Sequence, residues 1–295
     1  MAIPEPTPRA GFNTLLVATD LSARSQTALW CAAAMAHKSG AKIVVAHVIT
    51  PGRWHLVPPQ EMHPALCHDR RSTEKKMACL LKSDRLRGVR TDAVIKEGDF
   101  RRVLCNIVHE QHVDLLIAST HGRKGFSKLL FGSKVEEVCN KAPCPVLLVG
   151  PKVRQQQYEE YRKVLFTTDL TPLSLGALPP VLAFAAQHGS QLRIARVLPE
   201  DENKTPAEGK EFAVAQLRAE ILPALTARAG LACEPDFVVR YGSPKETILG
   251  LAEEWGADVI GMGGHRPGTL AVYLPGDLAY EVATDARCPV LTIID

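Results

Sequence analysis

The sequence contains two copies of one pattern, and this repeat limits the fold more than any other feature. LLVATDLSARSQTAL (15–29) matches VLFTTDLTPLSLGAL (164–178), DLLIASTH (114–121) matches DVIGMGGH (258–265), and CPVLLV (144–149) matches CPVLTI (288–293). The first pair is offset by 149 residues and the other two by 144, so the segments keep their order and nearly constant spacing. Such a chain is expected to fold as two units of one architecture.

Apolar runs alternate with helical patterns within each half. The runs are continuous, as in parallel strands that are buried on both faces. Strands are predicted near 14–19, 42–48, 91–96, 114–119, 145–149, 163–168, 191–197, 235–241, 258–262 and 289–294. Helices are predicted near 22–38, 69–87, 99–111, 133–141, 172–188, 207–229, 243–255 and 277–285. We predict an α/β chain of two tandem Rossmann-like domains, each an open, doubly wound, five-stranded parallel sheet with helices on both faces.

The repeat also gives the expected domain boundaries. We expect a flexible tail over 1–11, a first domain over 12–150, a polar linker over 151–162 and a second domain over 163–295. The proline-rich tail lacks the apolar segment of a signal peptide.

The composition excludes several classes of protein. Hydrophobic residues make up 46% and charged residues 23%, which is typical of a soluble globular protein. A net charge of +3 is too small to indicate nucleic-acid binding. No apolar run reaches the roughly 18 residues of a membrane span. The eight cysteines form no CxxC and mostly lie in apolar runs, which predicts buried thiols in a reducing cytoplasm.

Two segments of each half are expected at the carboxyl edge of the sheet, where open parallel sheets bind ligands. Thr19-Asp20 and Thr168-Asp169 follow the first strand of each half, and 119–133 and 263–277 follow the fourth. The Asp20 carboxylate either accepts hydrogen bonds from a nucleotide or caps the next helix, in competition with Ser22.

The segment STHGRKGFSKLLFGS (119–133) combines glycines with basic residues and a helix start. Ser133 is expected to open the helix 133–141, where the amides and the helix dipole favour an anion. Gly132 permits close approach of the backbone, and Gly122 permits the turn out of the strand. Positive charge comes from Arg123, Lys124 and Lys128. The pattern fits either a phosphate site or a basic surface loop.

These features together resemble the tandem form of the universal stress proteins, over about residues 12–150 and 160–295. The ATP-binding branch of that family carries Gly-x2-Gly-x9-Gly-Ser/Thr after strand four, and this chain has Ser119-x2-Gly122-x9-Gly132-Ser133. Because residue 119 ends a strand, we expect a negative φ there, and serine is then a small departure from glycine.

The resemblance implies that the first domain binds ATP, with or without Mg²⁺. It implies contacts from Ala18, Thr19, Asp20, Val48, Ser119, Gly122, Arg123, Gly132, Ser133 and Lys134. Asp20 would hold the adenine or the ribose, and Val48 would lie beside the base. Ser133, Lys134 and the amides around Gly132 would meet the phosphates.

The second half keeps the spacing of this motif but changes its chemistry, with Gly263-x2-Arg266-x9-Gly276-Asp277. Arg266 replaces a glycine, and the Asp277 carboxylate stands where Ser133 offers a hydroxyl. Because a carboxylate repels phosphate, we predict that the second domain does not bind ATP in the family manner. Asp169 preserves the base end of the site.

We therefore predict a cytoplasmic stress-response protein that binds ATP in its first domain and acts as a nucleotide-dependent regulator or binding module. No catalytic residue and no metal site are predicted. The alternatives are a scaffold that binds no nucleotide, and a slow ATPase or nucleotidyl-transfer enzyme. The resemblance also implies an internal pseudo-dimer of the two domains through their last strands, CPVLLV and CPVLTI. An unidentified protein partner and homodimerisation of the whole chain are further expectations.

Histidines outside the motif are given a lesser role. The segment RWHLVPPQEMHPALCHD (53–69) is predicted to be one long loop that carries His55, His63, Cys67 and His68. Their spacing fits no compact zinc motif, so a cover over the nucleotide edge or a partner surface is favoured. For His121 and His265, beside the motif, a structural role is favoured over that of a catalytic base.

Overall fold

The computed structural model describes residues 11–23, 25–50, 59–120, 144–153, 160–199, 206–226, 231, 233–264 and 278–294. The first half contains β1 (Thr14–Ala18), α1 (Gln26–Ser39), β2 (Lys42–Ile49), α2 (Pro59–Leu81), the 3₁₀ turn η2 (Asp84–Leu86), β3 (Thr91–Glu97), α3 (Phe100–Glu110), β4 (Leu115–Ser119) and β5 (Val146–Val149). The second half contains β6 (Lys163–Thr167), α5 (Pro172–Gly176), α6 (Leu178–His188), β7 (Gln191–Leu198), α7 (Pro206–Thr226), β8 (Asp236–Tyr241), α8 (Pro244–Trp255), β9 (Val259–Gly264), α9 (Leu278–Asp285) and β10 (Val290–Ile294).

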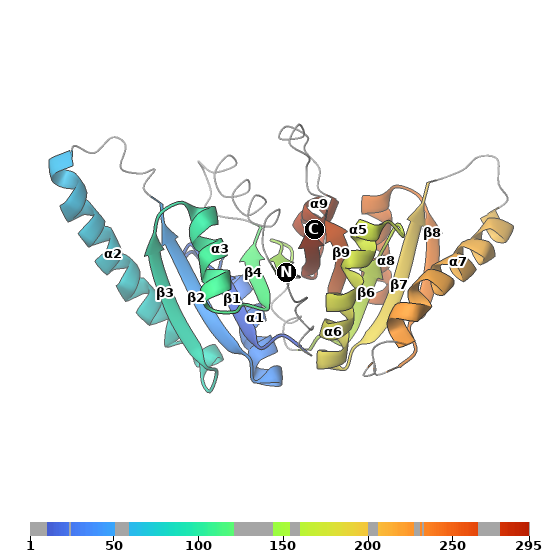
Figure 1. Cartoon of the computed structure of the whole chain (residues 1–295), viewed down its shortest axis with the longest axis horizontal. Helices are drawn as coiled ribbons and strands as arrows, with labels where there is room; N and C mark the ends of the chain where they lie inside the picture. The colour runs from blue at the N-terminus through green and yellow to red at the C-terminus, as the bar shows by residue number, and fades with distance from the viewer. Residues whose placement is uncertain are drawn as a thin grey trace, which may run out of the picture.

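The described strands form one continuous sheet in the order β3-β2-β1-β4-β5-β10-β9-β6-β7-β8. All neighbours are parallel except β5 and β10, which pair antiparallel with Leu147 opposite Leu291. The two halves thus join at their last strands, at the junction that the resemblance implies. Figure 1 shows the first half on the left and the second on the right, with α2 and α7 in corresponding outer positions.

The predicted α/β architecture with parallel strands in each half is confirmed, while several helix boundaries differ. The helix predicted over 69–87 is α2, which begins at Pro59 and is followed by η2. The loop predicted over 53–69 is therefore wrong from residue 59 onward, because Pro59 occupies the first helical position, where its missing amide costs nothing. The helix predicted over 172–188 divides into α5 and α6 at Ala177. Pro223 lies inside α7, which continues to Thr226, and the helix predicted over 133–141 lies outside the described residues.

Each face of the sheet carries a core that runs through both halves. On one face, α1, α2, α6 and α7 contribute buried side chains that include Leu29, Met77, Phe184 and Leu217. On the other face, α3, α8 and α9 contribute Leu104, Ile248 and Val282, among others. Because strands buried on both faces need apolar side chains at every position, these cores explain the continuous apolar runs of the sequence.

A second contact between the halves lies where α1 and α6 end. The Lys38 Nζ donates to the carbonyl oxygen of His188 at 2.6 Å, and the Phe12 amide donates to the Gln187 side chain at 2.7 Å. The rings of Phe12 and Tyr161 each lie close to Phe184, with centroids 6.2 and 5.2 Å away. We call this set of contacts among Phe12, Lys38, Tyr161, Phe184, Gln187 and His188 the α1–α6 seam.

The described part of the chain contains no helix with both the length and the hydropathy to cross a membrane.

Candidate functional site

The chain leaves β1 through a tight polar turn at the carboxyl edge of the sheet. The Thr19 Oγ1 lies 2.8 Å from the Ser25 Oγ and accepts a hydrogen bond from the Leu21 amide at 2.9 Å. The Asp20 Oδ1 accepts from the Ser22 amide at 2.9 Å. Leu21 has a φ of 60°, a left-handed conformation that is uncommon for a branched side chain. Three hydroxyl or carboxyl groups thus hold a strained turn that places Asp20 at the sheet edge.

The proposed capping role of Asp20 is not the one that the structure shows. Helix α1 begins at Gln26 after Ser25, so Asp20 does not cap it, while the Ser22 carbonyl accepts from the Gln26 amide at 3.3 Å at the helix start. The Asp20 carboxylate instead closes the turn, and the Ser22 Oγ accepts from the Ser25 amide at 3.3 Å. The Asp20 side chain therefore belongs to the edge of the sheet rather than to the helix.

A cavity of about 130 Å³ opens beside this turn. Its walls come from the end of β1, the end of β2 and one side of α2. The lining residues are Asp20, Leu21, the segment 47–50, Asp69, Ser72, Thr73 and Lys76. Two residues that the resemblance assigns to the base end, Asp20 and Val48, thus line one cavity.

His47 connects the two strand ends that form the cavity. Its Nδ1 lies 2.8 Å from the carbonyl oxygen of Thr19, across the gap between β2 and the turn after β1. The backbone is also joined there, because the Thr19 amide donates to the Ala46 carbonyl at 2.9 Å. His47 therefore fixes the turn that carries Asp20, a role that the sequence did not indicate.

The second half repeats the turn almost atom for atom. The Thr168 Oγ1 lies 2.7 Å from the Ser174 Oγ and accepts from the Leu170 amide at 2.9 Å, and Leu170 has a φ of 68°. The Asp169 Oδ1 accepts from the Thr171 amide at 3.0 Å and from its hydroxyl at 2.6 Å. Although partial burial opposes ionisation, hydrogen bonds from Ser174 and Thr171 lower the pKa of Asp169. The edge turn is thus a property of the repeat.

The wall beside the turn differs between the halves. His47 follows the residue of β2 that pairs with Ala18, and Arg196 follows the residue of β7 that pairs with Thr167, so the two are equivalent. The Arg196 Nη1 donates to the Gln216 Oε1 of α7 at 2.9 Å. A link between guanidinium and amide therefore joins strand and helix where the first half has its cavity.

The outer helices α2 and α7 also present different side chains beside this wall. Thr73 on α2 is buried and lines the cavity, whereas Leu217, at the corresponding turn of α7, is fully buried in the core. At this position the first half offers a hydroxyl group and the second half an apolar side chain.

Ser119 and its counterpart Gly263 differ because their surroundings differ. Ser119 ends β4 opposite Val149, and its φ is not positive, as predicted. A Cβ at Gly263 would lie 2.7 Å from the Ser174 Cα and 2.9 Å from the Leu173 carbonyl oxygen. Glycine is required at 263 because helix α5 lies directly against β9. Within the described residues of the first half, α1 begins only at Gln26, and serine stands at 119.

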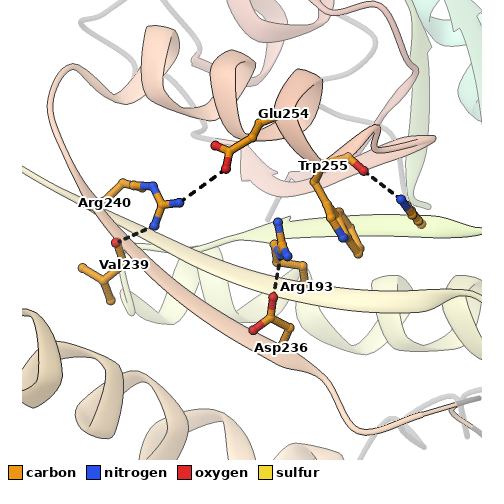
Figure 2. Close-up of polar contacts among 7 residues, drawn as sticks. Arg193, Asp236, Val239, Arg240, Glu254 and Trp255 are labelled. Carbon is orange, nitrogen blue, oxygen red and sulfur yellow. Dashed lines mark hydrogen bonds and ion pairs between the residues drawn. The ribbon is translucent and has the colours of Figure 1, made fainter.

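Other arginines of the second half have structural partners (Figure 2). The Arg193 Nε donates to the Asp236 carboxylate at 2.7 Å, and its guanidinium lies 4.6 Å from the centre of the Trp255 ring. Arg240 lies 3.8 Å from the Glu254 carboxylate. These side chains hold α8 against the sheet, so they are poor candidates for ligand contacts.

The structure places half of the predicted site residues. Ala18 ends β1, Thr19 and Asp20 follow it, Val48 lies in β2, and Ser119 ends β4. The residues Gly122, Arg123, Gly132, Ser133 and Lys134 lie outside the described part of the chain. His121, His265, Arg266 and Asp277 lie outside it as well.

Sequence reasoning missed the α2 wall. Asp69, Ser72, Thr73 and Lys76 line the cavity, and their spacing of three and four residues is the helical signal that could have revealed this. His63, Cys67 and His68 lie in α2 rather than in a loop. Within the described residues, no group of three or more His, Cys, Asp or Glu side chains is arranged to hold a metal ion.

Comparison with known proteins adds an independent finding. The model of the universal stress protein family matches residues 11–150 and again residues 160–293. A Thermus aquaticus protein, the universal stress protein in QAH/OAS sulfhydrylase 3′ region, is 32% identical over 139 residues, which make up 47% of this chain and 98% of that protein. Universal stress protein A homolog 1 of Coxiella burnetii is 27% identical over 147 residues, 48% of this chain and 98% of that protein. Each of these relatives is thus about as long as one half.

A solved structure resembles the whole chain. The crystal structure of a universal stress protein from Archaeoglobus fulgidus has a TM-score of 0.66 to this chain, with 20% sequence identity and 96% of each chain covered. At that identity the likeness concerns the fold alone.

Proposed function

Because this chain belongs to the universal stress protein family, with two domains of that family in tandem, we propose that its first domain binds ATP and that the protein acts as a nucleotide-dependent regulator or binding module in stress adaptation. The nucleotide would occupy the carboxyl edge of the first half. Its phosphates would extend toward the motif that ends in Gly132 and Ser133.

The cavity between β1, β2 and α2 is the observation that carries this proposal. The family resemblance assigns Asp20 and Val48 to the base end of the site, and both line that cavity. Open parallel sheets bind ligands at this edge, which adds a physical reason for the location. The described cavity of about 130 Å³ is smaller than a typical ligand pocket, so it supports the base or ribose end rather than a whole nucleotide.

The polar groups of the cavity suit a heterocycle or a sugar better than an apolar ligand. Asp20 and Asp69 supply acceptors, Ser72 and Thr73 supply hydroxyls, and Lys76 supplies a donor. A nucleoside presents both donors and acceptors, so it can satisfy this mixed set. An apolar ligand would offer these groups no hydrogen bonds in place of the water that it displaces.

The second domain is proposed not to bind ATP in the family manner. The proposal rests on Arg266 and Asp277 in its motif, and the link between Arg196 and Gln216 adds support from the base end. We propose no catalytic role for either domain and a cytoplasmic location for the protein. Homodimerisation of the whole chain and a protein partner remain part of the proposal.

Calorimetric titration with ATP, with and without Mg²⁺, tests the function and the asymmetry together. We expect one ATP per chain. Replacing Asp20→Asn removes one charged acceptor and should weaken binding about 10- to 100-fold, because such hydrogen bonds are worth about 1.5–3 kcal/mol. Asp169→Asn is the matched control, since it alters the equivalent turn in the other half and should leave the affinity unchanged.

A second variant separates the phosphate end from the base end. Ser133→Asp copies position 277 of the second half and should abolish ATP binding while leaving the affinity for adenosine nearly unchanged. Two ATP molecules per chain would contradict the asymmetry. Absence of any binding would favour the scaffold alternative, and turnover of ATP that Asp20→Asn abolishes would favour the enzyme.

A further inference from the structure

His188 is buried at the junction of the two halves. It is the last residue of α6 and only 3% of its surface is exposed. Its ring lies 4.5 Å from the Phe184 ring and 5.1 Å from the Tyr161 ring, measured between centroids. Neither ring nitrogen has a hydrogen-bond partner among the described residues. A buried polar ring without partners is rare and calls for a reason beyond packing.

Burial and a neighbouring ammonium group oppose a positive charge on this ring. The Lys38 ammonium of α1 lies at the carbonyl of His188 itself, and Tyr161 and Phe184 present aromatic rings. Behind Tyr161 lies the buried thiol of Cys31 on α1, which hydrogen-bonds to the Tyr161 side chain. The described groups that face the ring are thus an ammonium, two aromatic rings and, behind them, an uncharged thiol. None of them is a carboxylate that could balance an imidazolium.

We propose that His188 is an acid-sensitive latch between the two halves: its neutral ring closes the α1–α6 seam, and its protonation opens the seam. In the closed state the uncharged ring lies among aromatic side chains. The open state lets the charged ring reach water and leave Lys38.

The direction of the pH dependence follows from the two states. Burial first, and the Lys38 charge second, lower the pKa of His188 to about 4, from about 6.5 for an exposed imidazole. Between these values the open state binds a proton and the closed state does not. The opening equilibrium constant therefore rises about tenfold for each unit by which the pH falls from about 6.5, and it levels off below about 4.

Labelling of cysteines in the full chain tests the latch, because the chain carries its own controls. Cys31 is fully buried beneath the seam, Cys79 is exposed on α2, and Cys288 is buried on the opposite face of the sheet. A pyridyl disulfide that reacts in acid is added briefly from pH 7 to pH 4, and mass spectrometry gives the ratio of labelled Cys31 to labelled Cys79. This ratio cancels the intrinsic pH dependence of the thiol reaction.

In the wild type, the ratio should rise about tenfold per pH unit between pH 6 and pH 4.5 while Cys288 remains unlabelled. His188→Phe keeps a ring without a titrating proton, and its ratio should stay within about twofold. His188→Gln provides a second neutral side chain in case the larger ring is not accommodated. A constant ratio in the wild type, an equal rise in both variants, or labelling of Cys288 together with Cys31 would each overturn the latch.

Discussion

Gly150 shows how one missing side chain joins the two halves. A Cβ at this position would lie 1.9 Å from the carbonyl oxygen of Ala283 on α9, closer than any non-bonded contact allows. Helix α9 of the second half therefore reaches the end of β5 in the first half only because residue 150 is glycine. The Tyr280 hydroxyl donates to the Thr120 carbonyl at 3.3 Å in the same region.

Gly150→Ala should thus destabilise the protein by about 1–3 kcal/mol, the usual cost of forcing extra volume into a packed site. Gly250→Ala is the matched control, because a Cβ at this position in α8 meets nothing within 4 Å. It should be neutral or stabilise the chain by up to about 1 kcal/mol through helix propensity. Urea unfolding of both variants measures the difference, and equal stabilities would contradict the close contact with α9.

Single positions of the repeat also show how two similar halves acquire different sites. His47 and Arg196 are equivalent, yet one lines a cavity and the other is joined to Gln216 on α7. The turns that hold Asp20 and Asp169 are the same in both halves. The difference therefore lies in the wall of the site and not in the turn beside it.

At the scale of elements, a carboxylate ties three segments together. Asp285 ends α9 and contacts Lys152, which follows β5, at 2.6 Å and Lys245 of α8 at 2.8 Å. Hydrogen bonds from Lys152 and Lys245 lower the pKa of Asp285 to about 2. This group connects the segment after the first domain to two helices of the second.

The stability of the chain should follow this ionisation. An unfolded aspartate has a pKa of about 3.9, so the contribution of Asp285 is complete above about pH 4 and is lost as the pH falls from about 4 toward 2. The group is partly exposed, so its contribution is below about 1 kcal/mol. Asp285→Asn should lower the stability at pH 7 and flatten the decline below pH 4, as measured by urea unfolding across that range. Glu253→Gln is the control, because it removes a partner of Arg287 within the second half. Between pH 4 and pH 2 the stability of this variant should fall more steeply than that of Asp285→Asn.

Some elements could be predicted from the sequence and others could not, for physical reasons. Strands such as TLLVA and VLLV were predictable because burial on both faces requires continuous apolar residues. The start of α2 was not, since its prolines indicate a loop unless one of them occupies the first helical position.

The candidate site was predictable only in part. The family resemblance located Asp20 and Val48, and the helix predicted over 69–87 already contained the four wall residues of α2. Their place beside the site was missed because nothing in the sequence shows which side of that helix faces the ends of β1 and β2. The positive φ of Leu21 and Leu170 could not be foreseen, because hydrogen bonds to the threonines impose it on an unfavourable residue type. The α1–α6 seam could have been inferred from the repeat, because an aromatic residue, Phe12 or Tyr161, stands two residues before the first strand of each half.

At the scale of the whole molecule, the antiparallel pair of β5 and β10 turns two parallel sheets into one. The four residues of β5 are all buried, with β4 on one side and β10 on the other. Both cores run across this junction, so each half completes the other. An unpaired apolar strand at this position would be an exposed edge, which favours pairing with another chain.

Separating the halves should therefore create two chains that associate. Residues 1–153 made alone should form dimers or larger species through the freed β5 edge. Residues 160–295 should do the same through β10. Because the β5–β10 register and the contact between Gly150 and Ala283 are specific to the mixed pair, combining the two chains should yield a one-to-one complex in preference to either homodimer. Light scattering after size-exclusion chromatography measures the masses, and two half-chains that remain monomeric when mixed would refute the role assigned to this edge.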